Sequence, residues 1–249
     1  MKTLKTIVSI AIIAFLGSCS KSDDKVPNQQ NFTLELNFSN GNLSTGTTAS
    51  TGASAPTGYT WSEPEVANIF YGFAASVNNN FFLADDFVVP QGEKWSINKF
   101  VFYVYQTNYA GTNAPFDEIK YEIYNTKPSE VGATKIFGDF TNNKLESSED
   151  AKMYRIKNGF PDQLRKIYKM TATATNLELM PGTYWIKWQS KNSSNTIHYF
   201  PFNTTTGVAG IPTYNALTLS NLGVWSVCDS GASNKVDFPF GIIGTKTKL

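Results

Sequence analysis

Cysteine and histidine are scarce in this chain, and their scarcity limits the chemistry that it can carry. The sequence has two cysteines, Cys19 and Cys228, and one histidine, His198. A single histidine excludes zinc sites built on histidine pairs and leaves one candidate for the base of a catalytic triad. No nucleophile motif surrounds His198, and no G-x-S-x-G sequence or glycine-rich phosphate loop occurs. We therefore interpret His198 as a structural residue.

An excess of charge of one sign and a long apolar run are also missing. The 21 basic and 20 acidic residues give a formal net charge of +1. A chain so close to neutrality lacks the basic surface that phosphate backbones require, which argues against a nucleic-acid partner. The apolar run at residues 6–17 is shorter than the ~20 residues that a membrane-spanning helix needs.

The first residues have the pattern of a secretory signal peptide, because Lys2 and Lys5 precede the apolar run and small residues follow it. The sequence "LGSC" that ends at Cys19 resembles the lipobox of bacterial lipoproteins. This resemblance implies cleavage before Cys19, acylation of the sulfur and of the new amino terminus, and anchoring to a lipid bilayer. Cleavage would remove both lysines and change the net charge to −1. The alternative is an ordinary signal peptide with a chance cysteine.

The segment "SKSDDK" after Cys19 resembles the export signal of surface lipoproteins of Bacteroidota. The resemblance implies an outer-membrane protein that faces the cell exterior, whereas a solvated charged tether is the alternative. The expected organisation is a signal peptide at residues 1–18, a lipidated tether at 19–58 and a single β domain at 59–249. The tether includes a possible first strand at 32–38 and a flexible linker rich in small polar residues.

Strand signals recur along the rest of the chain at a spacing of roughly ten residues. In "EIKYEIYNT", Ile119, Tyr121 and Ile123 alternate with polar residues, and "WSINKFVFYVYQ" carries apolar residues on both faces. Glycine, proline and asparagine turns separate such segments. The pattern predicts an all-β fold, an antiparallel β-sandwich of jelly-roll type. Cys228 falls within one of these segments, and we interpret it as a buried structural thiol.

Two stretches carry a family resemblance. "LADDFVVPQGEKWSINKFVFYVYQ" and "LELMPGTYWIKWQ" resemble a β-sandwich module of Bacteroidota surface lipoproteins, marked by the sequences "ADDF" and "PGTYW". Together with "VDFPFGIIG", the resemblance extends over about residues 83–244. It implies a β-sandwich at the cell surface, and it implies no catalytic residues.

Asp85 and Asp86 interrupt an apolar strand, where aspartate is disfavoured. Strand alternation turns one of them toward a core face, and a buried carboxylate needs hydrogen-bond donors or a cation. A calcium site is one interpretation, since calcium takes six to eight oxygen ligands. We favour the alternative, a carboxylate bonded to loop amides, because neighbours on a regular strand point in opposite directions. No other cofactor is expected.

Tryptophan and tyrosine supply the candidate ligand-binding residues. Trp61, Tyr109 and Trp225 lie in or beside predicted loops, and Trp188 alternates with Trp185 along one strand. Exposed aromatic rings stack on sugars and other apolar partners, and binding hot spots are rich in these residues. The alternative is that all of them fill an aromatic core.

These observations favour a non-enzymatic surface lipoprotein that binds an extracellular ligand, with a glycan as the first expectation. A structural or adhesion protein that binds another surface protein is the alternative. A carboxylate-dependent glycoside hydrolase is least favoured, because it needs two carboxyl groups across a cleft. The remaining acid pairs lie in turn-like or exposed contexts, namely Glu63/Glu65, Asp117/Glu118 and Glu149/Asp150.

Overall fold

The computed structural model describes residues 33–65, 69–157, 159–203, 214–231 and 235–249. The chain divides into two compact units, Met1–Gln30 and Asn31–Leu249. The predicted signal peptide and the predicted anchor Cys19 lie outside the described residues. Where the chain is described it forms strands and no α-helix, and none of it is a helix able to cross a membrane.

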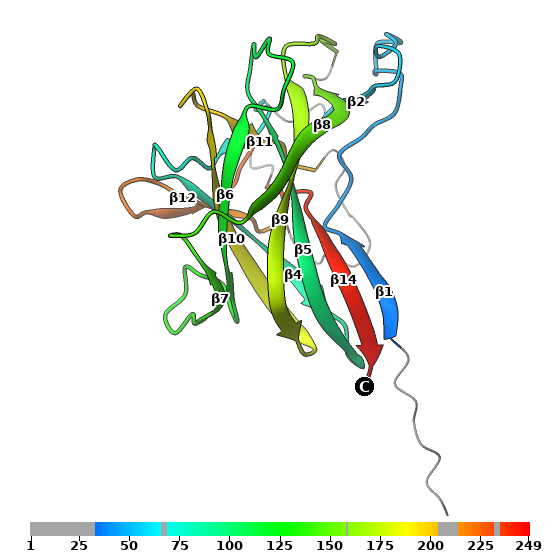
Figure 1. Ribbon diagram of the computed structural model, residues 1–249. Coiled ribbons are helices and arrows are strands. Elements are labelled where there is room, and N and C mark those ends of the chain that lie inside the picture. Colours follow the sequence, from blue (N-terminus) through cyan, green and yellow to red (C-terminus); the bar gives the residue numbers. More distant parts are fainter. Residues whose placement is uncertain (1–32, 66–68, 158, 204–213, 232–234) are drawn as a thin grey trace, which may run out of the picture. The chain divides into compact units, whose positions relative to one another are not determined.

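Two sheets make up the unit Asn31–Leu249 (Figure 1). The eight-stranded sheet runs in spatial order through β1 (Thr33–Ser39), β14 (Gly241–Lys248), β5 (Glu93–Tyr105), β9 (Lys166–Leu179), β8 (Leu145–Arg155) and β2 (Thr60–Ser62), with β11 (Tyr199–Phe200) paired to β5 and β3 (Phe73–Ala74) paired to β11. The six-stranded sheet runs through β13 (Trp225–Val227), β12 (Leu217–Leu219), β4 (Phe82–Val89), β10 (Gly182–Asn192), β6 (Phe116–Tyr124) and β7 (Lys135–Asp139). Only β2 and β8 pair in parallel among these described strands. The predicted all-β antiparallel sandwich is confirmed.

Strand alternation builds the core between the two sheets. On β10, Ile186 and Trp188 face inward, whereas Trp185 belongs to a separate apolar cluster on the opposite face. The ring of Trp188 is 1% exposed and lies 5.5 Å from the rings of Phe102 and Phe238. Truncating a buried aromatic side chain costs about 3–5 kcal/mol, so this aromatic centre is a major contact between the sheets.

The compact unit begins at Asn31, and the domain boundary predicted at residue 59 is wrong. β1 pairs with β14 over its full length, from Thr33 opposite Thr247, and Leu36 is buried in the main core. The segment predicted as a flexible linker also packs on the unit, because Leu43 and Ala49 are buried in satellite clusters. Isolated apolar residues attach this segment to the unit, and because they form no periodic pattern the sequence did not reveal the packing.

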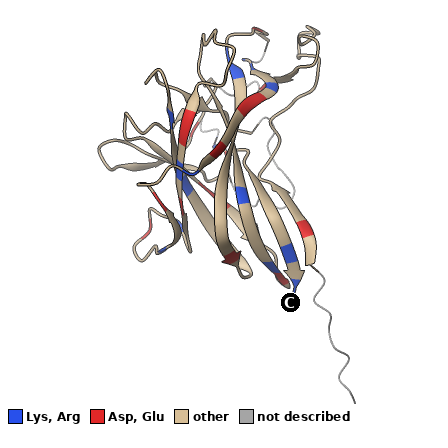
Figure 2. Cartoon of the chain, viewed as in Figure 1, with Lys and Arg blue, Asp and Glu red and all other residues tan. Residues whose placement is uncertain are grey.

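Charges of both signs are interspersed along the strands of the eight-stranded sheet (Figure 2). Ion pairs link different strands of this sheet, with N–O distances of 2.6–3.1 Å, at Lys94–Glu178, Lys99–Glu146, Lys169–Glu149 and Lys246–Glu93. Exposed pairs of this kind contribute little stability each, and they leave no field of one sign along the strands.

Candidate functional site

The predicted ligand-binding residues do not form one site, and two of them are buried. Trp188 lies at the centre of the core, and Trp61 is 3% exposed. Trp61 packs against Tyr154 and donates its Nε1–H to the carbonyl oxygen of Ala53. Trp188 points from β10 into the main core between the sheets. Trp61, on β2, packs into a smaller apolar cluster beside β8. Neither ring is available to a ligand, so these two predictions are wrong.

Tyr109 and Trp225 are half-buried and lie in different parts of the unit. Tyr109 packs edge-on against Tyr168 of β9, at a ring-centroid distance of 6.1 Å. Trp225 lies on β13 of the other sheet, and the Lys187 ammonium is 5.8 Å from its ring centroid. Each offers part of a ring to solvent, but the structure does not bring the two together.

A different set of aromatic side chains forms a pocket beside the end of β5. The pocket has a volume of about 390 Å³ and is lined by Ile69, Phe70, Tyr71, Gly72, Tyr105, Thr107, Arg165 and Tyr199. We call it the aromatic–arginine pocket. Its volume is in the range of small-molecule sites, about 300–1,000 Å³. The lining set contains no acid, histidine or cysteine, so the pocket offers binding groups and no acid–base pair.

Strand pairing explains why tyrosines distant in the sequence meet here. β11 joins β5 through Tyr199 opposite Tyr105, and it joins β3 through Tyr199 opposite Ala74. The rings of Tyr105 and Tyr199 stack with their centroids 5.8 Å apart. Tyr71 lies just before β3 and therefore reaches the same corner.

Gly72 permits the close approach that shapes the pocket. A Cβ atom added at Gly72 would lie 2.4 Å from the carbonyl oxygen of Phe200 and 3.1 Å from the hydroxyl oxygen of Tyr105. The first distance is too short for any side chain, so the backbone can lie against β11 only with glycine here. Gly72 thereby sets the position of Tyr71.

Arg165 supplies the charged wall of the pocket. Its Cζ atom lies 3.9 Å from the centroid of the Tyr71 ring. Its Nε donates to the carbonyl oxygen of Arg155 at 3.0 Å, and its Nη2 donates to Asp162 Oδ2 at 2.5 Å. Two such bonds fix the plane of the guanidinium over the aromatic face, which favours planar, directional recognition.

The pocket suits a ligand with apolar faces and polar edges. Tyr71 and Tyr199 are half-buried, and Phe70 and Ile69 stand at the rim with 49% and 60% of their surface exposed. Aromatic rings of this kind stack on the apolar faces of partners, while hydroxyl and guanidinium groups bond polar edges. Sugars combine both properties in one small ring.

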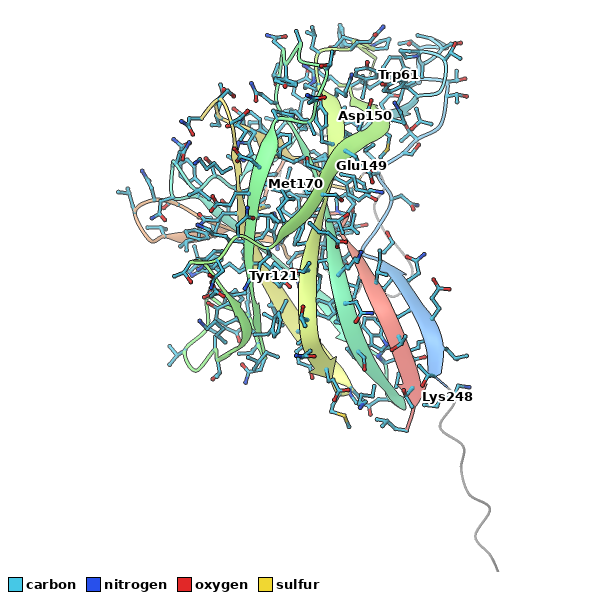
Figure 3. All side chains as sticks on the ribbon, in the orientation of Figure 1. Trp61, Tyr121, Glu149, Asp150, Met170 and Lys248 are labelled. Atoms are coloured by element: carbon cyan, nitrogen blue, oxygen red, sulfur yellow. The ribbon has the colours of Figure 1, made fainter. Side chains whose placement is uncertain are left out.

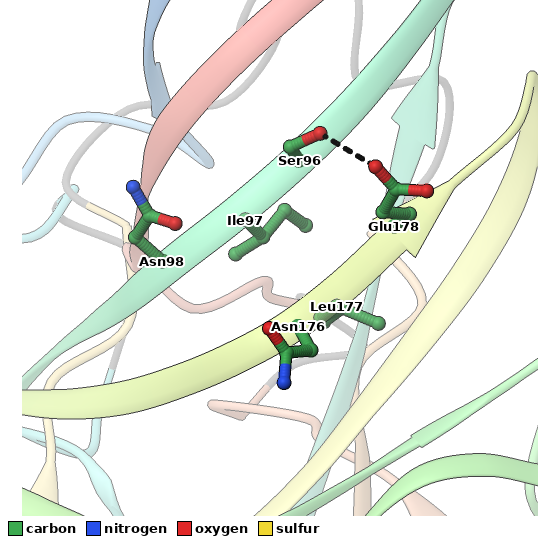
Figure 4. Close-up of a pocket in the computed structure, with 6 residues that line it drawn as sticks. All are labelled: Ser96, Ile97, Asn98, Asn176, Leu177 and Glu178. Carbon is green, nitrogen blue, oxygen red and sulfur yellow. Dashed lines mark hydrogen bonds between the residues drawn. The ribbon is translucent and has the colours of Figure 1, made fainter.

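A second hollow lies on the outer face of the eight-stranded sheet, where β5 and β9 bulge (Figure 4). Between the pairs Ile97–Leu177 and Lys99–Thr173, the two strands lose register, and Asn176 has a φ of 63°. The hollow contains no aromatic ring, and its carboxylate, Glu178, is bound by Ser96 and by the Lys94 ammonium. It is therefore a weaker candidate site.

Asp85 is the one of the two β4 aspartates that faces the core, and backbone and side-chain amides bind it. It is fully buried, and its Oδ2 accepts from the Phe238 N–H at 2.7 Å and from Asn40 Nδ2 at 3.1 Å. Burial raises the pKa of Asp85 well above its usual range, and the nearby Asp237 carboxylate raises it further. The geometry is that of the amide-bonded alternative. Within the described ranges no group of three or more His, Cys, Asp or Glu is placed to hold a metal ion, and calcium stays a prediction.

The two residues predicted to be structural are both buried. Nε2 of His198 lies 2.7 Å from Ser190 Oγ, and its Nδ1 lies 3.1 Å from the carbonyl oxygen of Thr196. Burial lowers the pKa of His198, and Ser190 is fully buried, so this serine–histidine contact is enclosed by protein and lines neither pocket. Cys228 is a fully buried free thiol whose pKa is raised by burial.

The predicted acid pairs are bound by other protein groups. Glu63 accepts hydrogen bonds from Ser50 and from the backbone of Gly159. Ion pairs hold three of the four acids of the other two pairs, at Glu118–Lys120, Glu149–Lys169 and Asp150–Lys152. None of these carboxylates lines the aromatic–arginine pocket.

Comparison with known proteins gives no relative from which the role of this pocket could be transferred. No family model, no curated protein and no solved structure matches the chain. The resemblance to the surface-lipoprotein module therefore stays an expectation, and the function has to be argued from the pocket itself.

Proposed function

We propose that this chain is a non-enzymatic lipoprotein of the outer cell surface, whose β-sandwich captures a glycan in the aromatic–arginine pocket. The anchor part of the proposal rests on the lipobox at Cys19. The capture part rests on the pocket, where Tyr71, Tyr105 and Tyr199 converge around a volume of about 390 Å³. Aromatic faces combined with a few fixed polar groups are the chemistry that recognises a sugar ring.

A protein partner is the second candidate, and one surface feature favours it. The hairpin of β12 and β13 carries three exposed apolar side chains: Leu222 is 84% exposed, Val224 is 57% exposed and Val227 is 39% exposed. Among the described strands β13 is also the last of its sheet, and a strand of another protein could pair with such an edge. This hairpin supports the adhesion alternative, in which the glycan pocket has no role.

A glycan array probed with the full chain in detergent tests the proposal. We expect specific binding with and without calcium, and a loss of at least about tenfold in affinity for Tyr199→Ala, as for a binding hot spot. Trp225→Ala is the matched control, since it removes a half-buried ring far from the pocket. A clean negative on the array, or binding lost only in Trp225→Ala, would reject the pocket as a glycan site.

A further inference from the structure

Arg155, at the end of β8, carries a charge that is enclosed by the protein. It is 0% exposed, and burial lowers the pKa of its guanidinium to about 9, so the group still carries its charge at neutral pH. Its Nε donates to the carbonyl oxygen of Tyr71 at 2.8 Å, and its Nη1 donates to Ser62 Oγ at 3.0 Å. Its Cζ lies 4.5 Å from the centroid of the Phe202 ring.

These contacts leave Arg155 incompletely satisfied. Its Nη2 has no hydrogen-bond partner, and no carboxylate of the described chain lies within ion-pair distance of it. A buried charge is normally paired, because removing an ion from water costs several kcal/mol unless an opposite charge compensates it. The site therefore holds a cation whose counter-ion the described protein does not supply.

Arg165 brings a second guanidinium to the same corner. The backbone N–H of Arg155 donates to the carbonyl oxygen of Arg165, so the two residues face each other across the β8–β9 connection. Burial raises the pKa of the Tyr105 hydroxyl, and the charges of Arg155 and Arg165 both act to lower it. Asp162 is the single acid that pairs with either arginine in the described chain, and the pair of arginines keeps one positive charge in excess.

Donors at this corner are free to meet a ligand. The bonds of Arg165 use its Nε and Nη2, and no hydrogen bond of the described chain involves its Nη1. Arg165 and the Tyr105 ring both line the pocket, whereas Arg155 lies beneath Tyr71 and contributes through its charge. A planar guanidinium flanked by a tyrosine hydroxyl matches the oxygens of an anionic group.

We infer that the ligand of the aromatic–arginine pocket is an acidic glycan, bound through an anionic substituent that contacts Arg165 and neutralises the excess charge of the Arg155–Arg165 pair. The inference rests on the proposed function and names its ligand class. A uronic-acid carboxylate and a sulfate ester present the same oxygen-rich anion, and the test separates these two sources.

Matched pairs of glycans that differ only in charge test the inference on the full chain in detergent. The carboxylate arm compares oligogalacturonides with their fully methyl-esterified forms, and the sulfate arm compares dextran sulfate with dextran. We expect the charged member of one arm to bind at least about tenfold more tightly than its neutral partner, because hydrogen bonds to charged groups are the stronger ones. The preference should weaken as salt is added.

Three variants assign the preference to the pocket. Arg165→Gln should abolish the difference between charged and neutral ligands, and Arg165→Lys should restore part of it. Lys169→Gln removes a charge from β9, outside the pocket lining, and should leave the preference unchanged. Circular dichroism and the thermal midpoint check that each variant is folded.

The outcomes separate the inference from the proposed function. Equal binding of charged and neutral partners, no binding of any charged glycan, or a preference that survives in Arg165→Gln would overturn the inference. In the first two cases, a neutral glycan that binds on the array and is lost in Tyr199→Ala would leave the proposed function standing. No glycan binding of any kind would overturn both.

Discussion

Two regions of this protein bury charge without an opposite charge beside it, and they solve the problem differently. Burial raises the pKa values of Asp85, Asp86 and Asp237, and repulsion by a neighbouring carboxylate raises those of Asp85 and Asp237 further. Arg155 is as deeply buried and has no carboxylate partner within the described chain. An aspartate can become neutral by binding a proton, whereas the Arg155 guanidinium keeps its charge at neutral pH.

This difference decides which region points to a ligand. The acid cluster can lose its charge by binding protons, and amide donors hold Asp85, so the cluster needs no outside counter-ion. Arg155 is not neutralised in this way at neutral pH. An opposite charge beside it therefore has to come from a bound molecule. A buried cation is therefore the stronger sign of a binding site in this fold.

The largest effect is expected from Asp85→Ala. The substitution leaves the N–H groups of Phe238, Asp86 and Asn40 buried without their acceptor. Each stranded donor costs about 1–3 kcal/mol, so we expect a loss of about 3–5 kcal/mol in the free energy of unfolding, measured by urea denaturation. Asp85→Asn keeps one acceptor oxygen and should cost clearly less. A loss below about 1 kcal/mol in Asp85→Ala would contradict the amide-bonded role.

A pH effect of intermediate size should come from the same cluster. Burial raises the pKa of Asp237 to about 6, compared with about 4 in an unfolded chain. The folded protein thus holds a proton that the unfolded chain releases, and the resulting stability is full below about pH 4 and is lost as pH rises through about 6. We expect the free energy of unfolding to fall by about 1–3 kcal/mol as the pH is raised from about 4 to about 7.

Asp237→Asn is the control for this pH effect, because an amide is neutral at every pH. Asn at this position can keep the bonds that Asp237 Oδ1 accepts from the backbone of Asn215 and Ala216. The variant should show a flatter pH profile than the parent chain in urea denaturation series. Identical slopes for the two proteins would show that Asp237 does not carry the effect.

A smaller change is expected from Arg155→Met, the counterpart test on the cationic side. The variant loses the bonds to Tyr71 and Ser62 but no longer buries an unpaired charge, and these effects should offset each other within about 1 kcal/mol. Urea denaturation of the ligand-free protein measures the difference. A loss of about 3 kcal/mol or more would mean that the protein itself satisfies the guanidinium, and the asymmetry between the two regions would disappear.

Calcium should have the smallest effect, with no shift in the thermal midpoint of the full chain. Amide N–H groups occupy the acceptor oxygens of Asp85, whereas a calcium ion would need free oxygens. Asp86 Oδ1 and Asp237 Oδ2 are without hydrogen-bond partners, so they are the atoms that a cation would use. A midpoint that rises with calcium and is insensitive to magnesium would reinstate the metal site.

Much of the fold was predictable from the alternation of apolar and polar residues along strands, because this two-residue pattern can be read from a short stretch of sequence. It puts Trp188 and Trp185 on opposite faces, and likewise Asp85 and Asp86, but it does not tell which member of each pair faces the core, and the structure places Trp188 and Asp85 there. Alternation does not predict the burial of Trp61, because β2 has 3 residues and is too short to show a pattern. It also does not predict the packing of the segment before β2, where single residues such as Leu43 are buried.

The aromatic–arginine pocket was not predictable in this way. Tyr71, Tyr105, Arg165 and Tyr199 come from four separate segments, and only the pairing of β3, β11 and β5 brings the tyrosines together. Arg165 precedes β9 in a connection with no motif of its own. The one available signal was the glycine after a tyrosine, Tyr71-Gly72, and sequence alone could not show what that glycine avoids.

The pairing of β1 with β14 places the start of β1 and the end of β14 at the same end of the eight-stranded sheet. Thr33 lies opposite Thr247, and Lys248 lies opposite Glu93 at the start of β5, whereas Tyr105 ends the same strand. Figure 3 places Lys248 at one end of the unit and Trp61 at the other. At about 3.3 Å per residue, β5 separates the two ends by about 40 Å. A bead or a dye attached beside Thr33 or Lys248 would therefore lie at the end of β5 that is remote from Tyr105 and the pocket that it lines.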